Sequence, residues 1–168
     1  MNEVLEADIC VIGAGSAGLS VAAGAVQMGA RVILVEKGKM GGDCLNYGCV
    51  PSKALLAAAH AASAQREGAR FGVLPGEGRC DPVKVHDHVQ DVIAAIAPMD
   101  SVERFEGLGV TVIQAAARFT GDREVTAGDK VIRAKRFVIA TGSSPVTPPI
   151  EGLDETPHFT NETIFSNR

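Results

Sequence analysis

Two cysteines, Cys44 and Cys49, are separated by four residues in a stretch rich in turn-forming residues. Two thiols at this spacing could form a redox-active disulfide, contribute to a metal site, or remain reduced structural side chains. A regular helix would hold their Cα atoms about 8 to 9 Å apart, beyond the limit of about 7 Å for a disulfide. Gly48 gives the backbone freedom and Pro51 suits the first turn of a helix. We therefore expect a helix to begin near Cys49, where its N-terminus favours a thiolate.

The metal alternative requires about four ligands. Cys10 and Cys80 each lack a second cysteine or a histidine at ligand spacing, and His86 and His88 are two residues apart, so that they face different ways on a helix. We predict no metal site, a core position for the Cys10 thiol and a loop position for Cys80.

The elements that would position such a pair begin with a strand at residues 7–12, a small-residue-rich helix at 15–28 and a second strand at 31–35. A short apolar run that ends at glycine is typical of a buried parallel strand. The three together predict a strand-helix-strand unit of the kind that binds dinucleotides.

A glycine fingerprint lies at the first turn of this unit. Gly13 permits the tight turn, Gly15 lets backbone amides approach a pyrophosphate, and Gly18 lets the helix pack closely on the strand. Glu36 follows about 20 residues on and is placed to accept hydrogen bonds from a ribose. The alternative is a glycine-rich helix start with a surface glutamate, and the fingerprint alone does not separate FAD from NAD.

Residues 41–53, Gly-Gly-Asp-Cys-Leu-Asn-Tyr-Gly-Cys-Val-Pro-Ser-Lys, resemble the redox motif of the flavin-dependent pyridine nucleotide-disulfide oxidoreductases. This family includes dihydrolipoamide dehydrogenase, mercuric reductase and glutathione reductase. The resemblance implies an enzyme in which NAD(P)H reduces FAD and the flavin reduces a Cys44–Cys49 disulfide. Cys49 would be the charge-transfer thiolate and Cys44 the exposed interchange thiol.

The resemblance also implies which residues contact FAD. Lys53 would lie near the reactive part of the flavin, although a solvated helix lysine is otherwise common. Residues 141–143 resemble the second flavin-domain signature at the end of a strand, and Ala117 matches a position whose backbone meets the adenine. The implied cofactor-binding set is Gly13, Gly15, Ser16, Ala17, Gly18, Glu36, Lys37, Gly42, Asp43, Lys53, Ala117, Thr141, Gly142 and Ser143.

The implied substrate is a small-molecule disulfide, a dithiol or Hg(II). Ser52 is similar to the dihydrolipoamide and mercuric branch rather than to glutathione reductase, in which a lysine is usual. Asp43 and Tyr47 depart from the commoner threonine and valine. These two differences do not affect the cysteine pair, but the motif does not identify the substrate.

The rest of the chain completes an α/β fold. We expect a Rossmann-like FAD/NAD(P)-binding domain, with a parallel sheet, helices and a small antiparallel β-meander. It would occupy residues 1–150, with 151–168 as an exit segment toward an NAD(P)-binding domain. The remaining expected elements are a helix at 51–70, a turn-rich connection at 71–82, a helix from 85 broken at Pro98, a strand at 110–115, short antiparallel strands at 118–120, 124–126 and 130–133, a buried strand at 137–140 and an extended tail from 143.

The 168 residues suffice for one core, and the net charge of −4 with mixed signs predicts neither a nucleic-acid nor a membrane partner. Glycines interrupt the apolar stretch at 9–30, so we do not expect a membrane span. The cysteine usage suits the cytoplasm, and the family resemblance implies a homodimer.

The sequence contains no second glycine fingerprint and no candidate acid/base His-Glu pair, both of which the family has. We therefore interpret it as the N-terminal part of a longer enzyme, with an open sheet edge, weak FAD binding and no turnover by itself. The alternative is a non-catalytic dinucleotide-binding module or an inactive fragment.

Overall fold

The computed structural model describes residues 3–73 and 79–167. The chain divides into two compact units, one formed by Met1–Cys44 and Ile96–Ser143, the other by Leu45–Ala95 and Ser144–Arg168. Each unit is described by itself. The predicted domain boundary at residue 150 stays a prediction.

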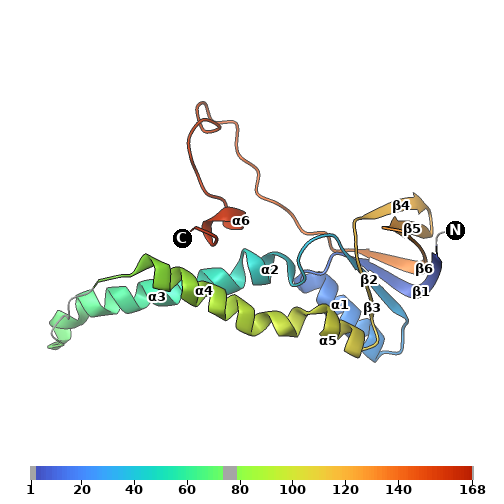
Figure 1. Ribbon diagram of the computed structural model, residues 1–168, viewed down its shortest axis with the longest axis horizontal. Helices are drawn as coiled ribbons and strands as arrows, with labels where there is room; N and C mark the ends of the chain where they lie inside the picture. The colour runs from blue at the N-terminus through green and yellow to red at the C-terminus, as the bar shows by residue number, and fades with distance from the viewer. Residues whose placement is uncertain (1–2, 74–78, 168) are drawn as a thin grey trace. The chain divides into compact units, whose positions relative to one another are not determined.

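The first unit contains a six-stranded sheet in the order β3-β2-β1-β6-β5-β4 (Figure 1). The strands β1, β2, β3 and β6 pair in parallel, whereas β4, β5 and the start of β6 pair antiparallel as a meander. The predicted Rossmann-like fold with a small meander is confirmed. The bounds are β1 Glu3–Ile12, β2 Val32–Glu36, β3 Thr111–Gln114, β4 Ala117–Gly121, β5 Glu124–Ala127 and β6 Lys130–Ile139.

Two apolar clusters build the core of this unit. The helices α1 (Ser16–Gln27) and α5 (Val102–Gly107) contribute Leu19 and Phe105 to a cluster with Leu34 of β2. The other cluster joins Cys10 of β1 and Ile132 of β6 with further apolar residues of β2, β3 and β5. Each fully buried large aliphatic or aromatic side chain stabilises the fold by about 1.5 to 3 kcal/mol.

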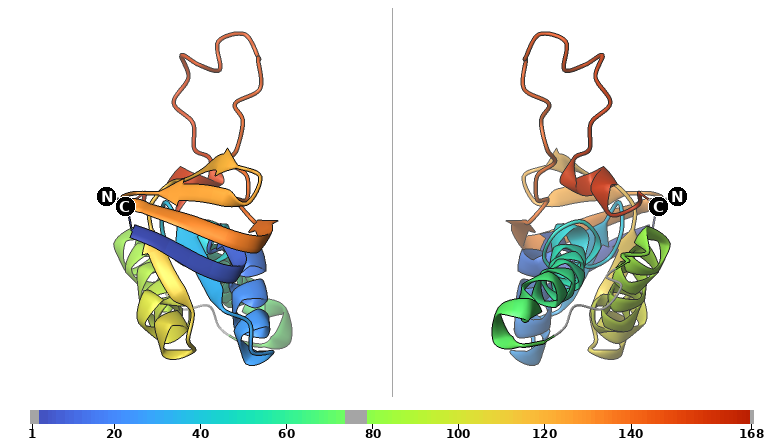
Figure 2. Two further views of the ribbon diagram at one scale, coloured as in Figure 1. Left: turned by 90° about the vertical axis from the view of Figure 1, so that its right-hand side faces the viewer. Right: turned by 90° about the vertical axis from the view of Figure 1, so that its left-hand side faces the viewer.

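Strand β6 corrects one prediction. The sequence predicts separate strands at 130–133 and 137–140, but the chain forms one ten-residue strand that pairs with β1 from Glu3↔Lys130 to Ile12↔Ile139 (Figure 2). No glycine or proline interrupts residues 134–136, and β1 offers backbone partners along the whole length. In the described part of the chain only β1 flanks β6 beyond Arg133, and Ile139 is 69% exposed. The C-terminal half is therefore not buried, and it leaves the open sheet edge that the sequence predicts.

The predicted break at Pro98 is confirmed. Helix α4 (Pro82–Ile96) passes into a 3-10 turn, η2 (Ala97–Asp100), before α5 begins. Proline lacks the amide hydrogen that an α-helix needs, so it favours this interruption.

The second unit consists mainly of α3 (Cys49–Glu67), a 3-10 turn η1 (Gly68–Phe71), α4 up to Ala95, and the short helix α6 (Asn161–Ile164). The Gln90 side-chain amide of α4 donates a hydrogen bond to the Phe165 carbonyl at 2.9 Å and so ties the C-terminal segment to this helix. Part of the predicted connection at 71–82 lies outside the described residues.

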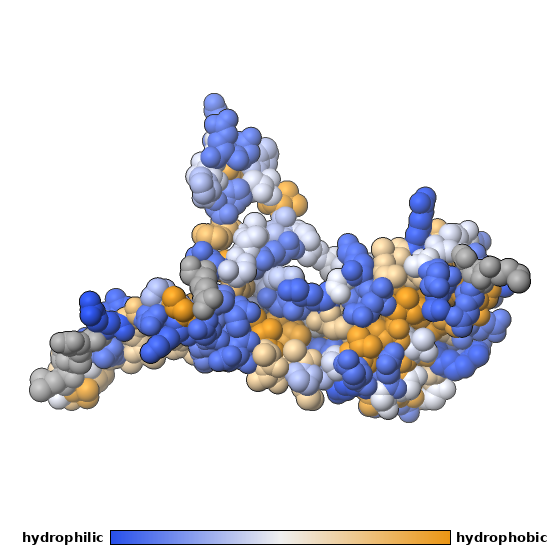
Figure 3. Space-filling view, viewed as in Figure 1, coloured by the Kyte–Doolittle hydropathy of each residue, from blue (hydrophilic) through white to orange (hydrophobic). Residues whose placement is uncertain are grey.

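The segment from residue 143 to 150 is extended and exposed, as predicted. It carries exposed apolar side chains, including Val146 and Ile150, beside hydrophilic neighbours (Figure 3). Among the described helices, none combines the length and apolar character needed to cross a membrane.

Candidate functional site

The glycine fingerprint forms a backbone crossing at the carboxyl ends of β1 and β6. Gly13 has φ +105°, and a Cβ on it would collide with the Ala140 carbonyl and lie 3.1 Å from the Thr141 Cα. A Cβ on Gly18 would collide with the Gly13 carbonyl. The structure therefore brings the fingerprint, the start of α1 and residues 141–143 together.

The start of helix α2 (Gly42–Asn46) approaches the same turn. Gly42 has φ +56°, and a Cβ on it would lie 2.6 Å from the Gly15 Cα. The Gly41 amide donates to the Ala14 carbonyl at 2.9 Å. Gly42 therefore lies next to the fingerprint and the exposed Asp43 follows it, and their contacts with FAD stay predictions.

The first turn of α1 has the properties of an anion site. Gly15 is the N-cap and provides no side-chain cap, the first turn contains no acidic residue, and Ser16 and Ala17 are exposed. Backbone amides of a first turn lack intrahelical partners, and the helix dipole favours negative charge there. The glycine crossing and this helix start fit the pyrophosphate of a dinucleotide.

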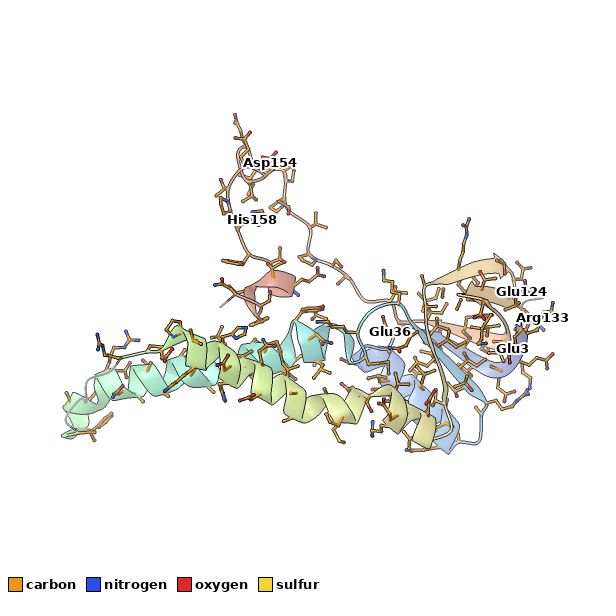
Figure 4. The ribbon with its side chains drawn as sticks, in the orientation of Figure 1. Glu3, Glu36, Glu124, Arg133, Asp154 and His158 are labelled. Carbon is orange, nitrogen blue, oxygen red and sulfur yellow. The ribbon has the colours of Figure 1, made fainter. Side chains whose placement is uncertain are left out.

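Glu36 stabilises the fingerprint loop directly. One of its carboxylate oxygens accepts from the Ala14 amide at 2.6 Å and the other accepts from the Gly38 amide at 2.6 Å (Figure 4). The sequence predicts a ribose contact for Glu36 but not these bonds. Each carboxylate oxygen has a further lone pair, so the ribose contact is compatible with them and stays a prediction.

The other residues of this unit that the sequence predicts to contact FAD lie next to strand ends, and the strand pairing aligns Ala117, through Ala127, with Lys130 at the start of β6. Their contacts with FAD stay predictions. Glu36 is in register with Gln114, and Ala117 begins β4 three residues later. Lys37 directly follows Glu36 and is exposed. Gly142 has φ +68°, and residues 141–143 are exposed after the end of β6.

The two cysteines lie on either side of a helix break. Cys44 is half-buried in α2, which ends at Asn46, and the exposed Cys49 is the first residue of α3. Gly48 between the helices has φ −126° and ψ −107°, outside the helical region. The predicted interruption is confirmed. Pro51 is buried in the first turn of α3.

Both thiols are reduced in the structure, and the disulfide stays a prediction. Cys44 belongs to the first compact unit and Cys49 to the second. Lys53 is exposed on α3, one turn after Cys49, as predicted.

A cavity of about 310 Å³ adjoins Cys44 in the first unit. Its polar residues Ser20, Asp100 and Arg104 could not be recognised from the sequence, because only tertiary packing brings α1, α2, η2 and α5 together. No motif or spacing marks them. The full lining is Ser16, Leu19, Ser20, Ala23, Cys44, Asp100, Arg104 and Phe105.

The other two cysteines occupy the predicted environments. Cys10 is fully buried, and this burial raises the pKa of its thiol to about 11. Cys80 is exposed before α4. Burial does not favour a nucleophilic thiolate at neutral pH for Cys10. The exposed position of Cys80 does not by itself indicate a role for its thiol.

The opposite end of the sheet carries ion pairs (Figure 4). Asp8 contacts Lys135 at 2.7 Å and accepts from the Arg31 amide at 2.9 Å, and both contacts hold the pKa of its carboxyl well below the usual range. Glu124 pairs with Arg133 at 3.0 Å. These ion pairs connect neighbouring strands, whereas the glycine crossing lies at the carboxyl ends of the parallel strands.

Together the parallel sheet, glycine crossing and helix start define a dinucleotide-binding α/β protein with a cysteine pair. The sequence profile of the family described as pyridine nucleotide-disulphide oxidoreductase matches residues 7–168. The chain belongs to this family, and the resemblance inferred from residues 41–53 is confirmed.

Similar proteins agree with this assignment. Mercuric reductases from Acidithiobacillus ferrooxidans and Serratia marcescens are each 36% identical to the chain, over 95% and 91% of its length. The solved Cu(II) complex of the HOCl-induced flavoprotein disulfide reductase RclA from Escherichia coli has a TM-score of 0.70 and 26% identity over 89% of this chain. The chain spans 30%, 35% and 31% of these three proteins, or about a third. Proteins of this family use FAD and NAD(P)H, and the glycine crossing of this chain fits the pyrophosphate of such a dinucleotide.

Proposed function

We propose that a protein carrying this chain is an FAD-dependent, NAD(P)H-linked oxidoreductase that uses Cys44 and Cys49 as its redox pair and reduces Hg(II). The observation that carries the proposal is the similarity to mercuric reductases over more than nine-tenths of the chain. Two features of the structure support the proposal: the helix break that separates Cys44 from Cys49, and the glycine crossing. No observation favours dihydrolipoamide as the substrate.

Bound FAD would supply two-electron transfer between the nicotinamide and the cysteine pair. The amides of the first turn of α1 bind the pyrophosphate, while Glu36 holds the loop and accepts from the ribose. Lys53 lies one turn beyond Cys49 and provides a positive charge on that face of α3. The first turn of α1 and Glu36 would hold the dinucleotide, and Lys53 would contribute its charge from α3.

The cysteine pair would perform the chemistry on the substrate. Reduction of the Cys44–Cys49 disulfide takes two electrons and two protons and yields two thiols. After deprotonation the two thiolates can ligate one soft metal ion, and Hg(II) prefers such ligands. A second equivalent of NAD(P)H would supply the two electrons that convert the bound Hg(II) to Hg(0), and Hg(0) then leaves both thiolates unchanged.

We further propose that this protein acts in the cytoplasm as a homodimer. Closely spaced cysteine pairs in cytosolic proteins are usually catalytic or metal-binding, and the spacing of Cys44 and Cys49 agrees with such a pair. Sedimentation of the full protein at several concentrations measures the dimer, and a monomer at all concentrations would contradict it.

The experiment is an assay of NAD(P)H oxidation by the protein that carries this chain, with and without Hg(II). We expect Hg(II)-dependent oxidation that Cys44→Ala and Cys49→Ala each abolish, whereas the matched variant Cys80→Ala retains it. Oxidation that does not increase with Hg(II) in any of the four proteins would contradict Hg(II) as the substrate, and no oxidation with any acceptor would favour a non-catalytic dinucleotide-binding module. Parallel arms with a small disulfide and with Cu(II) identify the substrate if Hg(II) gives no rate.

A further inference from the structure

A groove in the second unit is lined by α3 and by the start of α4, and its walls carry a surplus of positive charge. Its volume of about 710 Å³ falls within the range for small-molecule sites. Arg66 of α3, Lys84 of α4 and Arg79, which precedes α4, line the groove together with a single carboxylate, that of Asp81. The groove is therefore a candidate site for an anion.

The three cations have no acidic partner in the part of the chain that the structure describes. Every ion pair found among residues 3–73 and 79–167 joins other side chains. The Arg66 Nε donates to the Ala62 carbonyl at 3.3 Å, one turn earlier on the same helix. This bond leaves the two terminal nitrogens of the guanidinium for a ligand. Guanidinium groups bind phosphate through two parallel hydrogen bonds, and a lysine ammonium adds a compact charge.

The one carboxylate of the groove already binds the backbone of α4. Its Oδ1 accepts from the Val83 amide at 3.1 Å and from the Lys84 amide at 3.3 Å, so Asp81 caps the first turn of this helix. Asp81 is not within ion-pair distance of any of the three cations. Three cations and one carboxylate leave two positive charges in excess, in a chain whose net charge is −4.

The groove also offers an apolar surface beside its cations. Ala58, Ala61 and Ala62 line it from one face of α3, and Val85 adds an apolar side chain from α4. Arg66 follows the three alanines by one turn on the same helix. Because methyl groups are small and form no hydrogen bonds, this surface suits an uncharged, apolar part of a ligand.

From these features we infer that the groove binds a small organic phosphate. Its phosphate group lies among Arg66, Arg79 and Lys84, and its uncharged part lies against the alanines of α3. A phosphate monoester carries nearly two negative charges above its second pKa of about 6, which matches the excess charge of the groove. A carboxylate or a sulfate ester brings only one. The site uses none of the residues on which the proposed redox function depends.

The experiment is an NMR titration of the isotope-labelled 168-residue chain at about pH 7.5, where a phosphate ester is mostly a dianion. Four probes separate charge from shape. Phenyl phosphate carries two charges and an apolar ring, phenyl sulfate has nearly the same shape with one charge, inorganic phosphate lacks the ring, and isophthalate carries two carboxylates. The amide signals of Ala62, Gln65 and Val85 report on the groove. The amide signals of residues 15–18 report on the glycine site, which also attracts phosphate.

We expect phenyl phosphate to shift the groove signals and to bind there about two- to fivefold more tightly than phenyl sulfate, as for one additional accessible ion pair. Inorganic phosphate binds more weakly than phenyl phosphate because it lacks the apolar contact. Arg66→Gln, Arg79→Gln and Lys84→Gln each weaken phenyl phosphate binding by about two- to fivefold. Arg66→Lys keeps part of the affinity that Arg66→Gln loses.

Matched variants separate the groove from the net charge of the chain. Ala61→Glu adds a carboxylate to an exposed position on the groove wall and weakens phenyl phosphate binding more than any single Gln variant. Ala64→Glu adds the same charge to an exposed position of α3 outside the groove and leaves binding unchanged. Arg118→Gln, an exposed position of the first unit, and Cys49→Ala also leave it unchanged.

Shifts confined to the glycine site, equal affinity for phenyl phosphate and phenyl sulfate, or unchanged affinity in all three Gln variants would overturn the inference. Equal losses in Ala61→Glu and Ala64→Glu would attribute the effect to net charge and would also overturn it. Tighter binding of isophthalate than of phenyl phosphate would overturn the phosphate assignment in favour of a dicarboxylate. None of these outcomes contradicts the redox pair, because the titration does not involve Cys44 or Cys49.

Discussion

Glu36 is the side chain whose removal tests the glycine site most sharply. Its carboxylate joins two backbone segments 22 residues apart through the Ala14 bond, and it closes the turn after β2 through the Gly38 bond. A hydrogen bond to a charged group contributes about 1.5 to 3 kcal/mol. The hydrogen bond to the Ala14 amide is partly buried, so we assign it this full range. The hydrogen bond to the Gly38 amide is exposed to water and contributes about 0.5 to 1.5 kcal/mol. Glu36→Ala therefore lowers the free energy of unfolding by about 2 to 4.5 kcal/mol.

The change is large against a typical domain stability of about 5 to 15 kcal/mol. Urea unfolding followed by far-UV circular dichroism measures it, since the chain has no tryptophan and one tyrosine. Glu36→Gln keeps one acceptor oxygen and places an NH₂ group against a backbone N–H. Its free energy of unfolding should therefore decrease by at least half as much as that of Glu36→Ala. The matched control is Glu106→Ala, an exposed glutamate on α5.

In the protein that carries this chain, Glu36→Ala also lowers the flavin retained after dialysis. Unchanged stability in Glu36→Ala would refute the reasoning, because the carboxylate would then face solvent rather than the loop. Lower stability with full flavin retention would separate the loop-holding role from the ribose contact and contradict the latter.

Three further predictions concern the remaining features. Burial raises the pKa of the Cys10 thiol from 9.0 to about 11, so the unfolded chain loses this proton first. This group therefore leaves the free energy of unfolding nearly unchanged below about pH 9 and lowers it by about 2.3 kcal/mol at pH 11. Urea unfolding across this pH range should show that Cys10→Ala removes this part of the decrease, and an equal decrease in both proteins would contradict it. Because the pKa of Asp8 is lowered in the folded chain, its carboxylate stabilises the fold above about pH 4, and this stabilisation is lost as the pH falls further. Asp8→Asn should therefore lower the thermal midpoint at pH 7 and much less at pH 2. An equal decrease at both pH values would show that the effect does not come from the ion pairs. The 168-residue chain alone should bind FAD weakly and show no NAD(P)H-dependent turnover, because β6 has an open edge and the sequence has a single glycine fingerprint; stoichiometric yellow protein with robust turnover would contradict this.

The local features of the site could be predicted from the sequence because short-range chemistry determines them. The glycine crossing follows from Gly13 and Gly18, which no larger residue could replace, and the helix break follows from Gly48 and Pro51. Pro98 divided α4 from α5 for the same kind of reason, a missing backbone donor.

Features that depend on distant partners could not be predicted. Strand β1 begins at Glu3 rather than at residue 7, because Lys130 of β6 pairs with Glu3 at 2.5 Å and the backbones continue side by side. The same pairing makes β6 continuous across residues 134–136. Asp100 of η2 and Arg104 of α5 line one cavity with Cys44 only because of tertiary packing, and neither the hydrophobic period nor a motif encodes that placement.

The most direct test of the account is the state of Cys44 and Cys49 in the folded, mildly oxidised chain. Alkylation before and after reductant, followed by peptide mass spectrometry, measures which thiols are linked. We expect a peptide linked through Cys44 and Cys49 that loses two hydrogens on oxidation and regains them with reductant, while Cys10 and Cys80 stay unlinked. Free, independently alkylated Cys44 and Cys49 after oxidation of a folded sample would contradict the redox pair and with it the proposed function.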